Sequence, residues 1–399
     1  MLGRMHDGSA RKVERTSPAP AGCPVHEGAG GVWHVQGYPS SRAALRSAGT
    51  RQAGFGADNA RKLPRKMRVP VLWRDGPDHR EHRRQTARFF TPRRVDEKYR
   101  ELMHSFADEQ VARLLAGDET DVSRLSFDLA VAVAGQVVGL TNSDRHGMAS
   151  RLDRFFREFS VKPGFGSPEA IYRLMYSNTS LALFYFADVR PAIRARKRER
   201  QDDLISHLID DGASHGDIFG ECLTFAAAGM ITTREFITIA AWHLFTDPGL
   251  REAYTGGDRV GRLAILHEIL RLEPVVGNLA RWADEDIEVP AGDGTATIPR
   301  GARIDIAIAT ANLDPVAVGP DGTQVCPARS LADGVADSVL AFGDGPHKCP
   351  GAHIAIQESE IFLTKLFAVP GLRMVRAPRT RIRAEISSYE LQKLIVAAG

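Results

Sequence analysis

Apolar residues recur at helical spacing through most of the chain from about Arg83 to Leu270, with Pro and Gly at the breaks. Residues three or four apart lie on one face of a helix, so this spacing predicts mainly helical structure. In Asp217–Leu244 apolar residues occur on nearly every face, which is typical of a helix through the middle of a large protein. A second helix is predicted over Arg259–Leu272, because Pro274 follows its end.

The pattern changes after this second helix. Ile287–Pro290, Thr295–Ile298 and Arg303–Ile308 alternate or are β-branched, and they are predicted to be short strands. The stretch from Leu313 to Pro346 has little periodicity, and a long irregular segment within a compact domain is usually functional. A last helix is predicted over about Gly351–Phe367, followed by strand-like segments. The expected fold class is therefore mainly α with a small β region.

Composition adds limits on organisation and location. Residues 1–31 are rich in Gly, Pro, Ser and Arg and lack the apolar stretch that is typical of a signal peptide. We therefore expect a mobile N-terminal arm over 1–31 and a single catalytic domain over 32–399. No run approaches the roughly 18 apolar residues that span a bilayer. The longest apolar run, near Leu129–Leu140, contains Gly and Gln and is predicted to be a buried helix. A soluble, cytoplasmic protein without a membrane partner is expected.

Charge and cysteine usage narrow the class further. The net charge of +3 arises from 52 basic and 49 acidic residues, and this near-balance favours no nucleic-acid partner. The four cysteines, at 23, 222, 326 and 349, are far apart and form no C-x-x-C pair. A disulfide framework or a zinc site is therefore not expected, and reduced thiols in a cytosol are the simpler interpretation.

One cysteine lies in an unusual loop, Phe342-Gly343-Asp344-Gly345-Pro346-His347-Lys348-Cys349-Pro350-Gly351. Glycines allow the backbone to approach a ligand closely and to adopt positive φ. The loop precedes a predicted helix, and a thiol at a helix N-terminus is biased toward the thiolate, which is a nucleophile or a metal ligand. The alternative is a tight turn with an incidental buried cysteine.

The pattern F-G-x-G-x-H-x-C-x-G resembles the haem-binding loop of the cytochrome P-450 family. The resemblance implies the triangular fold of that family with its long central helix, and a haem b whose axial iron ligand is the Cys349 thiolate. Such a thiolate pushes electron density onto the iron and favours O–O cleavage. It also implies that Phe342 packs near the thiolate, that His347 reaches a haem propionate, and that Gly343 and Gly351 shape the loop. No C-x-x-C-H is present, so covalent haem attachment is not expected.

A second pattern, Glu268-Ile269-Leu270-Arg271, places opposite charges at i and i+3 of a helix, where they can meet. Alone it is an ordinary surface pair. These residues, and their place in the chain ahead of Cys349, resemble the E-x-x-R motif of the same family. The resemblance implies a buried structural triad of Glu268, Arg271 and Arg329 that supports the cysteine loop.

A third pattern, Ala228-Gly229-Met230-Ile231-Thr232-Thr233, lies inside the long helix. It resembles the family's oxygen-activating motif and implies that Gly229 and Thr232 are catalytic and that Ala228 faces the haem. Ile231 stands where the family has an acid. We hypothesise that Glu235, one turn further on, supplies protons through water. The alternatives are that Glu235 only pairs with a neighbouring helix, or that the substrate brings its own polar group.

Further matches concern the propionates and the substrate. His79 and Arg83 resemble residues at the start of a family helix that bind a propionate, and Arg281 resembles another such residue; taken singly, each Arg is more often a solvated surface residue than a propionate ligand. By the same resemblance two segments line the substrate pocket, although core or loop roles remain open. These segments hold Val275, Val276, Gly277, Ser388 and Tyr389.

Together these matches imply a monooxygenase that reductively activates O2 to hydroxylate or oxidatively couple a small organic substrate of the secondary-metabolite type. Electrons are expected from a ferredoxin or flavodoxin with its reductase, because the chain carries no Rossmann fingerprint. The departure at Ile231 keeps a peroxide-using or NO-reducing enzyme open as an alternative. A non-catalytic haem-binding module is a second alternative, against which Cys349 and Thr232 both argue.

A cationic run gives a first testable prediction. Five cations lie within eight residues at Arg61, Lys62, Arg65, Lys66 and Arg68. Such a run is usually a solvated face, but it also suits an anionic or carrier-bound substrate. If the substrate is anionic, neutralising these side chains should weaken its binding most at low salt, because exposed charges are screened beyond about 8–10 Å at physiological ionic strength. Titrations at several salt concentrations measure this, and an unchanged salt dependence would return the run to a solvated face.

Overall fold

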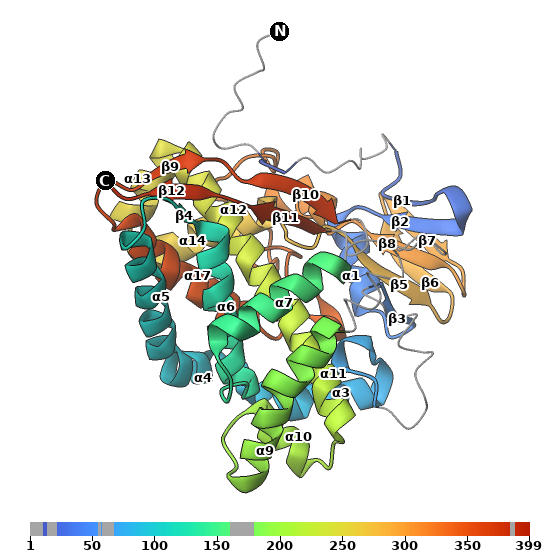
Figure 1. The fold of residues 1–399 in the computed structure, drawn as a ribbon. Helices are drawn as coiled ribbons and strands as arrows, with labels where there is room; N and C mark the ends of the chain where they lie inside the picture. The colour runs from blue at the N-terminus through green and yellow to red at the C-terminus, as the bar shows by residue number, and fades with distance from the viewer. Residues whose placement is uncertain (1–10, 14–21, 55–56, 58–67, 160–178, 384–387) are drawn as a thin grey trace, which may run out of the picture.

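The computed structural model describes residues 11–13, 22–54, 57, 68–159, 179–383 and 388–399. Helices form the larger part of the molecule, and a five-stranded sheet lies along one side of them (Figure 1). Within the described residues, no helix combines the length and the apolar character that crossing a bilayer requires.

The helices agree with the mainly helical prediction. The longer ones are α1 (Tyr38–Arg46), α3 (Gly76–Thr86), α5 (Arg100–Leu115), α6 (Val122–Val138), α7 (Arg145–Phe159), α9 (Arg190–Arg198), α10 (Leu204–Asp210), α11 (His215–Phe225), α12 (Thr232–Thr246), α13 (Pro248–Gly256), α14 (Arg259–Leu272) and α17 (Ala352–Phe367). Shorter turns are η1 (Ala29–Gly31), η2 (Val71–Trp73), η3 (Ala87–Phe89), α4 (Pro92–Arg94), η4 (Val95–Tyr99), η5 (Tyr185–Val189), η6 (Ala226–Ile231), α15 (Ile308–Ala311), α16 (Pro315–Val318) and η7 (Gly345–His347).

The central helix runs without a break through α11, η6 and α12, from His215 to Thr246. It begins with a capping box in which Ser214 and Asp217 satisfy each other's backbone N–H groups. Its second half packs against α6, α14, α17 and a C-terminal strand, and almost all of its side chains there are buried. The predicted long internal helix is thus confirmed, and it contains a π-helical turn at η6.

The strands form small sheets. They are β1 (Val25–Glu27), β2 (Val32–Val35), β3 (Thr50–Ala53), β4 (Thr120–Asp121), β5 (Leu279–Ala283), β6 (Ile287–Ala291), β7 (Gly294–Ile298), β8 (Arg303–Ile306), β9 (Arg373–Arg376), β10 (Arg379–Arg383), β11 (Ser388–Gln392) and β12 (Ile395–Ala397). The larger sheet has the order β1-β2-β8-β5-β3, with β2 parallel to β8. The predicted strands correspond to β6, β7 and β8, and β8 ends at Ile306 because α15 begins two residues later.

The predicted mobile arm over residues 1–31 requires a correction. Residues 1–10 and 14–21 lie outside the described residues, but strand β1 pairs with β2 and therefore belongs to the larger sheet. Further upstream, the Arg11 guanidinium donates to the carbonyls of Leu272 and Ala309 at 2.9 and 3.0 Å, and Val13 is buried. Burial of these few residues outweighs the Gly/Pro-rich composition from which the arm was predicted, and the boundary at residue 31 falls inside a hairpin.

Candidate active site

The cysteine loop folds back on itself just before α17. The Cys349 N–H donates to the Phe342 carbonyl at 2.8 Å, and the Lys348 N–H donates to Gly345 at 3.1 Å. Gly345 has a φ of 67° and packs so closely on α1 that a Cβ atom would collide with the Leu45 carbonyl oxygen. Any other residue would be strained there, because positive φ and close backbone contact both exclude a side chain.

The Cys349 thiol lies at the N-terminal end of α17. The backbone N–H groups of Gly351 and Ala352 hydrogen bond to it, and the Arg83 guanidinium is near. Burial nevertheless raises the pKa of the Cys349 thiol above its ordinary value, and these three donors only reduce the rise. The N–H groups at the helix terminus thus act in the expected direction, toward the thiolate, but burial outweighs them in the protein alone. A bound metal cation would supply the missing charge, because a coordinating thiol loses its proton.

Four cationic side chains gather beside the loop from α3, β5 and the loop itself. The rings of His79 and His347 stack with centroids 4.0 Å apart, and His347 Nε2 lies 3.1 Å from the Asp75 carboxylate. Arg83 donates to the Lys348 carbonyl, and Arg281 is 3% exposed with its guanidinium bonded to the Ala280 carbonyl.

The pKa values of these buried basic side chains are lowered. Burial, followed by the nearby charges of His347 and Arg83, lowers the pKa of His79 to about 3. Burial lowers the pKa of Arg281 to about 10, with Asp75 opposing the shift. Uncompensated positive charge is costly in a buried place, so the cluster fits an anionic ligand. The two carboxylates of a haem match it, and Arg pairs with carboxylates through two parallel hydrogen bonds.

A cavity of about 460 Å³ opens between α3 and the cysteine loop. His79 and Arg83 line it from the helix, and Pro346 and Pro350 line it from the loop. Two of the four basic side chains and the thiol-bearing loop thus border one concave space. The donor set and this space together fit a haem held by one thiolate and several cations.

The π-helical turn η6 creates an open face on the central helix. The Thr232 hydroxyl donates back to the Ala228 carbonyl at 2.6 Å, while a side chain at Gly229 would meet open space. Ala228 is exposed and Thr232 partly so, whereas Ile231 on the other side is buried. π-helical turns are frequent at functional sites because they leave backbone groups unpaired.

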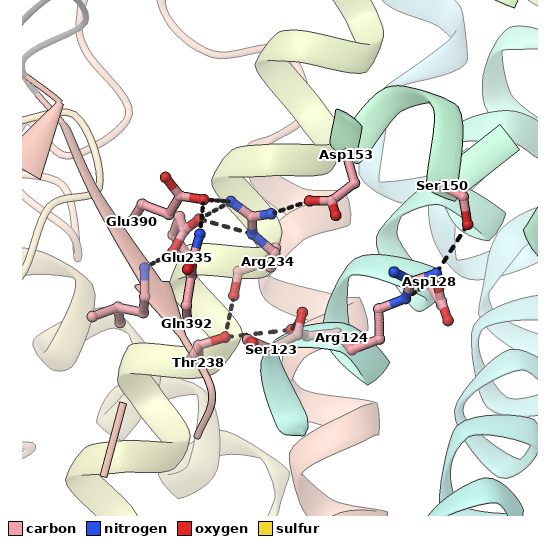
Figure 2. Close-up of polar contacts among 12 residues, drawn as sticks. Ser123, Arg124, Asp128, Ser150, Asp153, Arg234, Glu235, Thr238, Glu390 and Gln392 are labelled. Carbon is pink, nitrogen blue, oxygen red and sulfur yellow. Dashed lines mark hydrogen bonds and ion pairs between the residues drawn. The ribbon is translucent and has the colours of Figure 1, made fainter. Parts of the chain in front are cut away.

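Glu235 does not lie where a proton relay needs it. Its side chain is fully buried and accepts a hydrogen bond from the Arg234 Nε at 2.8 Å and another from the Leu391 N–H on β11 at 2.6 Å (Figure 2). Both carboxylate oxygens are therefore engaged on the side of the helix that faces the C-terminal strands. This geometry argues against a Glu235 relay, because both oxygens already accept hydrogen bonds, although burial raises the pKa of Glu235 against the opposing effect of Arg234.

The structure instead shows a different buried acid, Glu358 on α17. It is 3% exposed, hydrogen bonds to the side chain of Thr233, and its Oε2 atom has no partner. Burial raises the pKa of Glu358 to about 8, so it holds its proton at neutral pH. A signal for it exists in the sequence, because Glu358 shares a helix face with the buried Ile354 and Ile361.

Glu268 and the two arginines meet as the family pattern implied. The Arg271 guanidinium donates twice to the Glu268 carboxylate at 2.7 Å, and Arg329 donates to it at 2.8 Å. Arg271 also donates to the carbonyls of Asn312, Gly322 and Gln324 in the irregular segment. The cluster of Glu268, Arg271 and Arg329 therefore fixes the position of the chain upstream of the cysteine loop.

The expected pocket segments lie next to each other. Val276 and Ser388 form an isolated β-bridge, and the Tyr389 hydroxyl donates to the Glu273 carbonyl at 3.0 Å. Val275 is buried, and the Gly277 carbonyl accepts from Ala309. Folding thus brings together two of the predicted pocket segments that are more than a hundred residues apart.

The cationic run falls almost entirely outside the described residues. Arg61, Lys62, Arg65 and Lys66 belong to the part of the chain that is not described. Arg68 is described, and its guanidinium forms an ion pair with Asp211 at 2.6 Å. Its backbone N–H donates to Asp217. At Arg68, therefore, the charge is already matched by an internal carboxylate.

Comparison with known proteins agrees with the fold and the loop. A family model described as Cytochrome P450 matches residues 263–368. Mycinamicin IV hydroxylase/epoxidase of Micromonospora griseorubida is 27% identical over 88% of this chain and 85% of its own length. Erythromycin C-12 hydroxylase of Saccharopolyspora erythraea is 28% identical over 90% of this chain and 87% of its own.

Solved structures show the same fold. CalO2 superposes with a TM-score of 0.77 at 23% identity, covering 94% of this chain and 93% of its own. CYP109B1 from Bacillus subtilis, described as a versatile cytochrome P450 enzyme, gives 0.74 at 22% identity over 94% and 95% of the two chains. At these identities the likeness concerns the fold.

Fold, loop and relatives define the class as an oxidoreductase that incorporates oxygen into its substrate. Residues 263–368 match the model of the cytochrome P450 family, and the chain is similar to cytochrome P450 proteins over most of its length.

The ion cluster around Glu268 is predicted to be required for stability and haem content. Glu268→Ala or Arg271→Ala leaves a buried charge without its partner, which costs roughly 3–5 kcal/mol. We expect little soluble, haem-loaded protein from either variant, measured as yield and haem per chain. Glu81→Ala is the matched control, because Glu81 pairs with Arg84 at the same i, i+3 spacing on an exposed surface. Normal yield and haem content in both triad variants would contradict the structural role.

Proposed function

We propose that this protein is a haem-thiolate monooxygenase that binds haem b through Cys349 and oxidises a small organic substrate of the secondary-metabolite type. One observation carries the proposal: the Cys349 loop, two arginines and two histidines gather at the start of α17, beside a cavity that His79 and Arg83 line. When bound there, the haem supplies reductive activation of O2. The relatives named as hydroxylases support the substrate class.

Each element of the chain has a task in this proposal. Cys349 is the iron ligand, with Phe342, Gly343 and Gly351 shaping its loop. His79, Arg83, Arg281 and His347 bind the propionates. Ala228, Gly229 and Thr232 form the open face of the central helix, where the Thr232 hydroxyl orients a water molecule. Val275, Val276, Gly277, Ser388 and Tyr389 line the substrate side.

Electrons in this proposal come from a separate ferredoxin or flavodoxin with its reductase, in the cytoplasm. Arg80 and Arg88 are exposed on or just after α3, beside the cavity at the cysteine loop. Cationic side chains at that place suit an acidic electron carrier, because complementary charge speeds encounter. The substrate is free or carrier-bound; P450BioI has been solved in complex with an acyl carrier protein ligated to a fatty acid.

Proton supply by Glu358 replaces the relay assigned to Glu235. Glu358 carries a proton at neutral pH and touches Thr233, the neighbour of Thr232. In our proposal, water passes this proton to the open face at Thr232. A protein-borne acid favours the O2-dependent reaction over the peroxide-using or NO-reducing alternatives, which the missing acid at Ile231 had kept open.

The iron ligand is tested by the absorption spectrum. The reduced CO complex should show the red-shifted Soret band that is diagnostic of thiolate ligation, and Cys349→His should abolish it. Cys326→Ser is the control, because Cys326 contacts Glu268 only through its backbone N–H and should keep the band. A Cys349→His protein with an unchanged band would assign the ligand to another residue.

The acid is tested by coupling. Glu358→Gln keeps a partner for Thr233 but has no ionisable proton, so product per electron consumed should fall and peroxide release should rise. In the parent enzyme the proton is present below about pH 8 and is lost above it, so coupling should fall as the pH rises through that value. The variant should lack this dependence. Glu360→Gln, two residues further along α17 and paired with Arg262, should behave like the parent. Unchanged coupling in Glu358→Gln would refute the assignment.

A further inference from the structure

A buried ion network joins the central helix to the C-terminal strands (Figure 2). Arg234 and Glu235 lie in the first turn of α12, Glu390 lies on β11, and Arg383 lies on β10. Asp153 on α7 completes the group. All five side chains belong to residues that are at most 7% exposed. The network therefore connects elements that lie far apart in the chain through charges that water does not screen.

The contacts run continuously from helix to strand. Glu235 accepts from Arg234 at 2.8 Å and from the backbone N–H of Leu391 at 2.6 Å. The Arg234 guanidinium also lies 3.6 Å from the Glu390 carboxylate. Glu390 in turn accepts two hydrogen bonds from Arg383, at 2.9 and 2.7 Å. Side chains of α12 thus contact β11 at the Leu391 backbone N–H and at the Glu390 side chain.

The neighbouring charges favour the ionised forms of Arg234 and Glu390, whereas burial raises the pKa of Glu235 against the opposing effect of Arg234. Burial disfavours charge on Arg234, but the neighbouring carboxylates, first of them Glu235, raise its pKa above the ordinary value. Burial likewise opposes ionisation of Glu390, yet Arg383 and Arg234 lower its pKa. Buried ionic groups of this kind stabilise only when every member is in place, so they favour one geometry over its neighbours.

The network ends at the substrate side. Arg383 and Ser388 are the final pair of the β10–β11 ladder, and Ser388 also bridges to Val276. At the other end, Arg234 follows Thr232 by two residues on the same helical turn. A rigid link of buried charges therefore runs from the helix turn that carries Thr232 to the strand end that carries Ser388 and Tyr389.

We propose that the Arg234–Glu235–Glu390–Arg383 network sets the separation between Ser388–Tyr389 and the open face at Thr232, and thereby determines which sizes of substrate the enzyme accepts. This inference rests on the proposed function, because it takes these two surfaces as walls of the substrate pocket. Glu235 is then a positioning residue, and it acts on substrate fit through β11.

The test compares two buried glutamates. Glu390→Gln removes one charge from the network, and Glu360→Gln removes one charge from the pair with Arg262 outside it, in which Glu360 is likewise buried. The probes are imidazole, which is small, and 4-phenylimidazole, which is bulky, each titrated by the haem absorption change. We expect the ratio of the two affinities to shift by about fivefold or more in Glu390→Gln, the low end of coupling between linked sites. The ratio should stay at the parent value in Glu360→Gln.

Companion variants separate positioning from simple loss of stability. Glu235→Gln should shift the same affinity ratio while leaving product per electron unchanged. Arg383→Lys, which keeps the charge, should restore most of the discrimination that Arg383→Met loses, and it also carries the test if Glu390→Gln yields too little protein. An unchanged ratio in Glu390→Gln or in Arg383→Met would overturn the proposal, as would an equal shift in Glu360→Gln.

A second measurement does not depend on haem. Amide hydrogen exchange in the peptide that contains Leu391 should be faster in Glu390→Gln than in Glu360→Gln, because the link to α12 is weakened. Equal exchange in the two variants would show that the network does not hold β11, whatever the cofactor. A parent protein without the thiolate Soret band would contradict the proposed function instead, so the two failures are distinguishable.

Discussion

The Glu268 carboxylate is the contact on which the rest of the site depends. Two guanidinium groups and the Cys326 backbone N–H converge on it, and Arg271 extends the same cluster to three carbonyl groups of the irregular segment. That segment has little secondary structure of its own, so its path is decided by these bonds. A buried ion cluster tolerates few geometries, because an incomplete one leaves charge without solvent. The loop that carries Cys349 therefore starts from a defined position.

A second constraint is the crowding of cations at that loop. His79 and Arg83 arrive on α3 and Arg281 on β5, while His347 belongs to the loop itself. Burial is the main cause of the lowered pKa values of His79, Arg281 and His347, and the Asp75 carboxylate opposes the shift at each of them. An anionic ligand that binds the folded chain relieves this repulsion and stabilises the fold by mass action. Folding and cofactor binding are in this sense one process.

Two glutamates show how surroundings decide chemical role. Glu235 and Glu358 are both buried and both lie near Thr233. Glu235 follows Thr233 by two residues in the sequence, and Glu358 hydrogen bonds to the Thr233 side chain. Glu235 meets a guanidinium and a backbone N–H that engage both of its oxygens, so it serves as a structural group. Glu358 meets a hydroxyl and has no cation beside it, so burial keeps it protonated. The first suits positioning, and the second suits proton transfer.

The sequence by itself determined the helical class, the limits of α14, the strands β6 to β8 and the identity of the cysteine loop, because these depend on local periodicity and on glycine and proline chemistry. It also placed Glu268 and Arg271 within reach, since their spacing on a helix brings them together. Tertiary structure alone decided which face of α12 Glu235 occupies, that Glu358 reaches Thr233, and that residues 25–27 join a sheet. The two glutamate contacts depend on partners more than a hundred residues away, and spacing along the chain carries no information about such contacts. Strand β1 pairs with the nearby β2, but β2 in turn pairs with β8, which comes from the other end of the chain.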